Sequence, residues 1–384
     1  MLQETSGSQV RPAPRRTHQN HMDYAARVTV VRDAMRGAGI DLLAVPPGDD
    51  LRWLTGFSPV ADERACYLFL AERDGLFLVP ELNAVQSERH IRQPFVTYSD
   101  AAGPARALAA AGEQFASPRV IAVGDTMRAD ALLLLQQTWR DARFLPGATV
   151  LAPLRMRKTG EEIAALRRAA ATADAAVETA VRACRAGVTE LEVARAADEA
   201  FRRAGAPEVL GTIVGSGPNS AFPHHHSSTR ALRDGEPVLF DLGSRADGYC
   251  SDITRMAFLG TPSTRYREIH RIVENAVAAA LEVIKPGVPI SAIDLAARRI
   301  IERGGYGQQF VHRTGHGIGL SGHEPPSIAH TNEMPLEEGM AFSAEPGIYL
   351  PGEFGVRLEE IVVVTRDGCE VLSHLSRDVR AASG

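Results

Sequence analysis

Four acids and one histidine in the second half of the chain stand where apolar strands would otherwise continue. They are Asp241, Asp252, His316, Glu345 and Glu359. Four carboxylates that face a common point repel one another strongly unless cations lie between them. These residue types therefore predict a metal site rather than a set of surface charges.

The spacing of the acids indicates how they could meet. Asp241 and Asp252 flank the turn-like sequence 244–248, and Glu345 and Glu359 flank a second turn-rich sequence. If the apolar flanks form antiparallel hairpins, the two acids of each pair lie opposite each other on one face, with Cβ atoms ~5 Å apart. Carboxylates that close suit a two-metal site, in which ions ~3.5–4 Å apart share a bridging hydroxide.

These residues belong to five short motifs: Asp241-Leu-Gly, Ser251-Asp-Ile-Thr-Arg, Gly315-His-Gly-Ile-Gly, Glu345-Pro-Gly-Ile-Tyr and Val356-Arg-Leu-Glu. The set resembles the pita-bread metallopeptidases, and within them the Xaa-Pro dipeptidases (prolidases) and aminopeptidase P. The order Asp, Asp, His, Glu, Glu is the ligand order of that family. The resemblance implies an α+β fold: a C-terminal pita-bread domain, with a curved antiparallel sheet backed by helices and metals on its open face, after a smaller α/β domain.

The resemblance gives the acids distinct roles. Of Asp241 and Asp252, one would chelate a single ion and the other would bridge two, and Glu359 matches the second bridging carboxylate of the family. Glu345 would coordinate one ion and also transfer protons. Glu360 is the alternative to its neighbour Glu359, but on a strand it points to the opposite face.

The metal implied is a pair of divalent ions. Oxygen-rich ligands with one imidazole, His316, admit Mn, Fe, Co and Zn. The resemblance favours Mn, with Co, Zn or Fe as the alternatives.

Histidines outside the ligand set match substrate-contacting positions of the family. His224 matches the histidine near the scissile carbonyl, and His323 matches the histidine that stabilises the tetrahedral oxyanion. We expect both to contact substrate and to take part in catalysis. The neighbours His225 and His226 have no such match, and we expect them to be solvated loop residues.

Three further residues are candidates for the substrate site. His312 precedes the metal-site histidine by four residues and is expected to line the substrate pocket. Arg357 would share a strand face with Glu359, so it could orient the carboxylates during catalysis or bind a substrate carboxylate. Tyr349 is a weaker candidate for substrate binding.

The activity that the resemblance implies is metal-dependent hydrolysis of the Xaa-Pro bond. Glu345 would take a proton from the bridging water and return it to the proline nitrogen. The substrate would be an Xaa-Pro dipeptide or a short peptide with proline second. The modest length and the short loop 351–355 favour the dipeptidase.

Two alternatives keep the same fold. One is a hydrolase or lyase for a non-peptide small molecule, similar to ectoine hydrolases or sulfonium lyases, because pocket-wall residues decide the substrate. The other is a binding protein without activity, which the complete ligand set disfavours.

The composition excludes several partners. The 384 residues carry a net charge of −5, which gives no reason to expect nucleic acid or an anionic membrane as partner. The chain has four scattered cysteines with no CxxC spacing, typical of a reducing compartment, and no run approaches the ~18 apolar residues of a membrane span. Residues 1–20 lack a signal-like apolar region, and we expect a disordered tail. The sequence therefore predicts a cytoplasmic protein, and the family suggests a homodimer.

Residues 21–150 alternate helical and strand patterns, which is typical of an α/β layer. Apolar strands at 66–70 and 76–79 flank a turn sequence that predicts a hairpin. This domain would resemble the N-terminal domain of creatinase, and no catalytic constellation is visible in it. We expect it to shape one wall of the site and to make subunit contacts.

Residues 151–384 would form the catalytic domain. Thr159 with Glu162 and Thr189 with Glu192 are capping boxes, which satisfy free N–H groups at helix starts.

Two further helices are predicted in this domain, over 264–284 and from a cap at Ser291 to residue 304, and the strands would complete one sheet with helices on one side. A helix pair followed by an acidic hairpin thus occurs twice.

Overall fold

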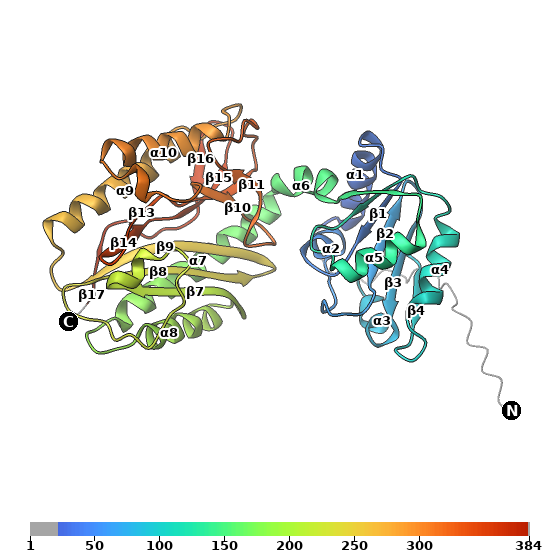
Figure 1. The fold of residues 1–384 in the computed structure, drawn as a ribbon, viewed down its shortest axis with the longest axis horizontal. Coiled ribbons are helices and arrows are strands. Elements are labelled where there is room, and N and C mark those ends of the chain that lie inside the picture. Colours follow the sequence, from blue (N-terminus) through green and yellow to red (C-terminus); the bar gives the residue numbers. More distant parts are fainter. Residues whose placement is uncertain (1–21, 383–384) are drawn as a thin grey trace. The chain divides into compact units, whose positions relative to one another are not determined.

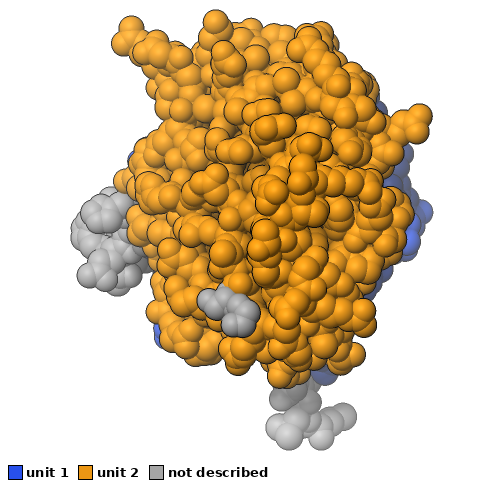
Figure 2. All heavy atoms as spheres, turned by 90° about the vertical axis from the view of Figure 1, so that its left-hand side faces the viewer, with its two compact units in different colours: residues 1–155 blue, residues 156–384 orange. Residues whose placement is uncertain are grey.

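The computed structural model describes residues 22–382, and the chain divides between Arg155 and Met156 into two units. Figure 1 gives the helices and strands of each unit, and Figure 2 colours the two units on a space-filling view. The tail expected over residues 1–20 lies outside the described residues. Among residues 22–382, no helix combines the length and apolar content needed to cross a membrane.

The first unit contains a six-stranded sheet of order β4-β3-β2-β1-β5-β6. Strand β2 pairs antiparallel with β1 and β3, and the remaining neighbours are parallel. The hairpin predicted at 66–79 is therefore confirmed. The elements are α1 (Tyr24–Gly37), β1 (Leu42–Val45), α2 (Asp49–Thr55), β2 (Tyr67–Ala71), β3 (Gly75–Pro80), α3 (Glu81–Ser87), β4 (Phe95–Tyr98), α4 (Ala105–Gln114), β5 (Val120–Val123), α5 (Ala129–Thr138), β6 (Arg143–Pro146) and α6 (Ala148–Met156).

The first two helices of the second unit start as the capping boxes predict. In α7 (Gly160–Ala183) the Thr159 hydroxyl accepts from the Glu162 backbone while the Glu162 carboxylate accepts from the Thr159 N–H. Thr189 and Glu192 repeat this arrangement at α8 (Glu190–Arg203). The prediction of a Ser291 cap was wrong, because α10 (Ser291–Arg303) already includes Ser291, whose N–H donates to the Asn332 carbonyl at 2.7 Å.

The strands of the second unit form three hydrogen-bonded sheets rather than the one sheet expected. Their orders are β17-β9-β8-β7, β11-β10-β12-β15-β16 and β13-β14. The elements after α8 are β7 (Glu208–Ser216), the 3-10 helix η1 (Gly217–Ala221), β8 (Pro237–Ala246), β9 (Tyr249–Leu259), α9 (Thr264–Glu282), α10, η2 (Gly307–Gln309), β10 (Gly315–Gly317), β11 (Glu324–Ile328), β12 (Ala341–Ala344), β13 (Gly347–Leu350), β14 (Phe354–Arg357), β15 (Glu360–Val364), β16 (Cys369–Val371) and β17 (Arg380–Ala382).

Each half of the second unit has its own helix pair and its own core. Helices α7 and α8 pack on β7, β8 and β9, whereas α9 and α10 pack mainly on the strands from β12 to β15. Figure 1 shows the strands lying between the two helix pairs. The helices thus take the outer faces, and the inner strand faces remain available to a site.

Candidate active site

The first acidic pair lies on the hairpin of β8 and β9. Its two-residue turn is Asp247-Gly248, and both residues have positive φ, 51° and 84°, as a tight hairpin turn requires. Asp241 pairs with Thr254 and Asp252 pairs with Gly243. The prediction that the two aspartates face each other directly was wrong, because the turn lies further along the chain than their midpoint. The offset is two residues, so both side chains still share one face.

The second acidic pair lies where two ladders are interrupted. Ala344 pairs with Glu360 before the interruption, and Gly347 pairs with Arg357 after it. The register is unchanged across the interruption, so Glu345 faces Glu359 as the spacing predicted. Their N–H groups donate elsewhere: that of Glu345 to the Thr314 carbonyl at 2.7 Å and that of Glu359 to the Thr254 carbonyl at 3.2 Å.

Glu360 points away from the acid pair. Its carboxylate accepts from Arg255 at 2.8 Å and from Arg377 at 3.2 Å. Between the two neighbouring glutamates, it is Glu359 that lies with the other acids.

His316 is on β10, which lies between β11 and β12 in the sheet and packs closely against neighbouring backbone on both sides. A Cβ on Gly315 would lie 1.9 Å from the Ser343 carbonyl oxygen, and one on Gly317 would lie 2.2 Å from that of Pro325. Burial first, and then His323, lower the pKa of His316 to about 4, so the ring is neutral at pH 7. Its Nδ1 lies 3.1 Å from the Gly317 carbonyl and must be the donor, which leaves the Nε2 lone pair free for a ligand.

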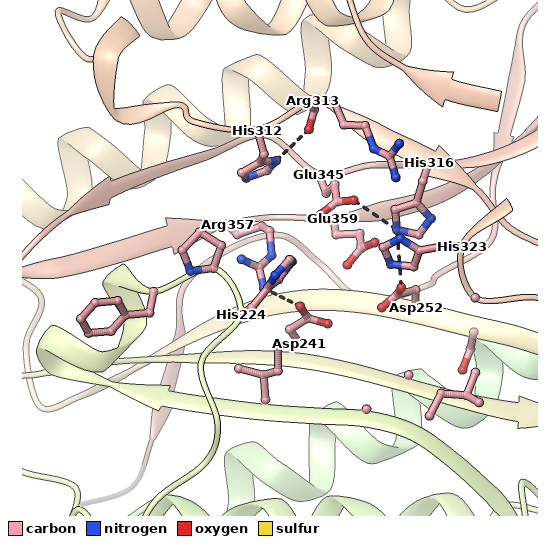
Figure 3. A pocket seen from close by; sticks show the side chains of 18 residues that line it. His224, Asp241, Asp252, His312, Arg313, His316, His323, Glu345, Arg357 and Glu359 are labelled. Carbon is pink, nitrogen blue, oxygen red and sulfur yellow. Dashed lines mark hydrogen bonds and ion pairs between the residues drawn. The ribbon is translucent and has the colours of Figure 1, made fainter. Parts of the chain in front are cut away.

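The described side chains form three overlapping groups of possible ligands, one of which is Asp252, His316 and His323. The other two groups share the carboxylate of Glu359. Asp241, Asp252 and Glu359 offer oxygens within 4.8 Å of one another, as do the ligand atoms of His316, Glu345 and Glu359. The Nε2 of His316 lies 3.3 Å from Glu345 and 3.8 Å from Asp252. Figure 3 shows these side chains converging. Two adjacent sites with Glu359 between them are what a pair of ions needs.

The electrostatics of the acid cluster fit bound cations. Burial, followed by Asp241 and Glu345, raises the pKa of Asp252 well above its usual range, and burial followed by Asp252 raises that of Glu359. Burial raises the pKa of Glu345 to about 7, with Asp241 adding to it. Glu359 Oε1 is buried and has no hydrogen-bond partner among the described residues. Oxygen donors with one imidazole suit divalent metals.

Arg357 contacts the acid cluster and its neighbours through all three of its guanidinium nitrogens. Its guanidinium is buried and donates through Nη2 to Asp241, through Nη1 to the Tyr349 hydroxyl at 2.8 Å and through Nε to Thr254 at 3.1 Å. Thr254 in turn donates to Glu359 Oε2 at 2.9 Å. Burial opposes the charge of Arg357, but Tyr349 and Asp241 raise its pKa overall.

The histidines expected to touch substrate lie around the same cavity. His224, His312 and His323 all line a cavity of about 790 Å³ together with the acids. His323 also stacks on His316, with ring centroids 3.6 Å apart, and its ring comes within ligand reach of Asp252. His224 is exposed on a loop.

Two residues differ from expectation. His225 is not a solvated loop residue: its Nε2 lies 2.9 Å from buried Glu190, and its side chain is 13% exposed. The reason is that the loop turns this ring inward while His226 stays exposed. Tyr349 is buried and bonds Arg357 and His312 (2.9 Å), and it is absent from the described residues that line the cavity.

Sequence reasoning missed an apolar wall and one cation. Leu210, Ile213 and Phe222 line the cavity, and so does the exposed Arg313. Leu210 is the extra residue of a β-bulge between Val209 and Gly211, a device that re-aims a side chain. The bulge leaves no trace in the sequence pattern, whereas the place of Arg313 three residues before His316 was a usable signal.

Two models of known protein families match this chain. Residues 164–366 match metallopeptidase family M24, and residues 27–157 match the Creatinase/Prolidase N-terminal domain. The chain therefore belongs to metallopeptidase family M24. The predicted family and the α+β pita-bread fold with its preceding α/β domain are confirmed.

Individual relatives give a finer picture. The chain is 45% identical over 229 residues to an Xaa-Pro dipeptidase from Lactobacillus helveticus, a match that spans 59% of this chain and 62% of that relative. A solved prolidase from Thermococcus sibiricus has a TM-score of 0.90 and 33% identity, covering 94% of this chain and all (100%) of that one. An X-Pro aminopeptidase from Thermotoga maritima has a TM-score of 0.79 and 31% identity over 91% and 99% of the two chains.

Proposed function

We propose that this protein hydrolyses the Xaa-Pro bond of dipeptides, and that two divalent ions are held by Asp241, Asp252, His316, Glu345 and Glu359. The observation that carries the proposal is the pair of ligand groups that share Glu359 beside one cavity. The ions would polarise the scissile carbonyl and make a bridging water acidic enough to act as the nucleophile near neutral pH.

Glu345 is suited to carry the proton of the reaction. It belongs to a ligand group beside the cavity, so its carboxylate could accept a proton from the nucleophile and return it to the proline nitrogen. Ser343 donates to its Oε1 at 3.0 Å, which fixes the carboxylate. Such a leaving nitrogen has no N–H, so the site needs no acceptor for one.

His323 and His224 are proposed to contact the substrate around the scissile carbonyl. Both line the cavity that contains the acids. A neutral imidazole donates one N–H, which stabilises the negative oxygen that develops during attack. His312, held by Tyr349, would form the neighbouring wall, and Tyr349 itself would act through His312 and Arg357.

Arg313 is proposed to bind the carboxylate that follows proline in a dipeptide. All three nitrogens of Arg357 already contact protein side chains. Arg313 is exposed in the cavity, where one Nη lies 3.1 Å from Ser327. A cation at the cavity is what recognition of a free carboxylate requires. This favours the dipeptidase over the aminopeptidase.

Three further properties are proposed from the family resemblance and the chemistry. Oxygen-rich ligands suit Mn, with Co, Zn and Fe as alternatives. The four cysteines are free, which fits the reducing cytoplasm. A homodimer is the assembly we expect, and sedimentation equilibrium would test it.

The test is hydrolysis of an Xaa-Pro dipeptide and a matching Xaa-Pro-Yaa tripeptide, with Mn added and with metal chelated. Metal-dependent cleavage of the dipeptide supports the proposal. Cleavage of mainly the tripeptide would make the protein an aminopeptidase. Cleavage of neither by metal-loaded protein would refute both and leave a hydrolase or lyase for a non-peptide small molecule, as in the ectoine- and sulfonium-acting relatives.

A further inference from the structure

One loop brings three residues to the cavity and contains little regular secondary structure. Residues 216–228 leave the end of β7, pass through the short helix η1 and continue as coil. Phe222, Pro223 and His224 lie at the far part of this loop, and all three line the cavity. The position of His224 therefore depends on what fixes the two arms of the loop.

A single buried carboxylate binds both arms. Glu190 Oε1 accepts from the Ser216 N–H (2.8 Å), the Ser216 hydroxyl (2.7 Å) and the Asn219 amide (3.0 Å) on the incoming arm. Glu190 Oε2 bonds His225 Nε2 (2.9 Å) and accepts from the Ser228 N–H (3.0 Å) and hydroxyl (2.7 Å) on the outgoing arm. Each oxygen thus serves one side of the loop, and the carboxylate closes its base.

The charge of Glu190 fits this arrangement. The residue is fully buried, and a buried charge is tolerated only when hydrogen bonds satisfy it. Burial alone would raise its pKa, but the bonds from His225, Ser216 and Ser228 lower it overall. Glu190 is also the first residue of α8, where the helix dipole favours an anion. The serine and asparagine groups around Glu190 all donate to it, and an ionised carboxylate can accept all of these hydrogen bonds.

The loop has a second link to the catalytic strands. The Gly355 N–H on β14 donates to the Ser220 hydroxyl at 2.9 Å, and a Cβ on Gly355 would lie 2.1 Å from the Ser220 carbonyl oxygen. Strand β14 also carries Arg357, which holds Asp241. The loop is therefore fixed at two places: by β14, which carries Arg357, and by Glu190.

We propose that Glu190 is a positioning residue that holds His224 at the cavity by binding both arms of the 216–228 loop. The role in catalysis rests on the proposed Xaa-Pro hydrolysis. The clamp itself is a property of the fold. Glu190 lies outside all three groups of metal-ligand candidates, so it acts through the loop rather than through the ions.

The experiment is a double-mutant cycle on the metal-loaded full chain. Glu190→Gln keeps the shape of the side chain but places an NH₂ against donors. We expect kcat/KM for an Xaa-Pro dipeptide to fall about 10- to 100-fold, the cost of a misplaced catalytic contact. Metal content should stay unchanged. Glu192→Gln is the matched control, because it changes an exposed acid of the same helix turn and keeps the capping box; it should have no effect.

To separate a positioning role from general damage, the effect of Glu190→Gln on kcat/KM is measured both in wild type and in the His224→Ala protein. If Glu190 acts through His224, Glu190→Gln lowers the rate of wild type but not that of the His224→Ala protein. Equal losses in both backgrounds, or no loss in either, would overturn the proposal.

Hydrogen exchange tests the clamp independently of activity. Amides of residues 216–228 should exchange faster in Glu190→Gln than in wild type or Glu192→Gln. If no peptide is cleaved, the proposed function fails while this measurement still decides the clamp. Unchanged exchange would mean that Glu190 does not hold the loop.

Discussion

The two acidic strand pairs of the second unit reach the same point in different ways. On β8 and β9 the ladder is continuous, and the aspartates lie diagonally, two residues out of direct opposition. Between β12–β13 and β14–β15 the ladder stops, and the glutamates face each other across the interruption. The aspartates thus lie on a continuous ladder, whereas the glutamates, which have longer side chains, lie where the ladder stops. Two acid pairs that flank similar turn sequences can therefore differ in register.

The two pairs also depend on each other. Arg357, from the strands of the glutamates, donates to Asp241, and Thr254, from the strands of the aspartates, donates to Glu359. Each half of the site therefore supplies the polar partner for an acid of the other half.

The largest effect is expected at Glu359, which belongs to two of the three ligand groups. Glu359→Gln should lower kcat/KM about 10³-fold, equivalent to about 4 kcal/mol of barrier, because both ion sites lose a carboxylate. Metal analysis should show a loss of bound ions. Glu353→Gln, at the exposed tip of the second hairpin, is the control and should keep both metal and activity. Full metal content in Glu359→Gln would contradict the shared-ligand assignment.

Removing Arg357 should lower the free energy of unfolding of the metal-free protein by about 3–5 kcal/mol, because the partly buried Asp241, whose side chain is 23% exposed, is left beside Asp252 without its buried cation. Urea denaturation of Arg357→Met measures this. Thr254→Val removes only a hydroxyl and should cost about 1–3 kcal/mol. If Thr254→Val proved the more damaging change, the exchange between the halves would not depend on charge.

The pH dependence of stability should differ between wild type and Glu345→Gln, both free of metal. The folded pKa of Glu345 is about 7 against an ordinary value of 4.5, so its contribution to stability is present below pH 4.5 and is lost as the pH rises to 7. Wild type should lose about 3 kcal/mol relative to the variant over that range.

The buried histidines His312 and His316, whose pKa values burial lowers to about 4, act in the opposite direction. They are present in both proteins, so their effect cancels in the difference. Glu345 also raises the pKa values of Asp252 and Glu359, and losing that contribution in the variant adds to the difference in the same direction. A constant difference between pH 4.5 and 7 would show that Glu345 has an ordinary pKa.

The smallest effect is expected at the bulge residue beside the first acidic pair. Leu210→Ala should lower kcat/KM about tenfold for dipeptides with a large apolar first residue, the usual effect of lost apolar contact in a pocket. Gly-Pro should be unaffected, because it has no side chain to contact the wall. Leu133→Ala, on the exposed face of α5, is the control. An equal loss for both substrates would exclude a role in specificity.

The sequence predicted which residues would gather but not how the strands place them. The capping boxes and the five motifs are local, so α7, α8 and the acid cluster could be read directly from residue types. The offset of Asp241 and Asp252 depends on which two residues make the turn, and several polar residues there could do so. The interruption at Glu345, the bulge at Leu210 and the partner of His225 depend on strands and helices distant in sequence, which no local pattern records.

The exchanged contacts set a time order for the chain. The partners Arg357 and Asp241 are 116 residues apart, and Thr254 and Glu359 are 105 apart. Loops of that length close late in folding, after local helices and hairpins have formed. The ion-binding centre cannot exist in a folding intermediate in which either half is missing. Metal uptake would therefore mark the completion of folding rather than its beginning.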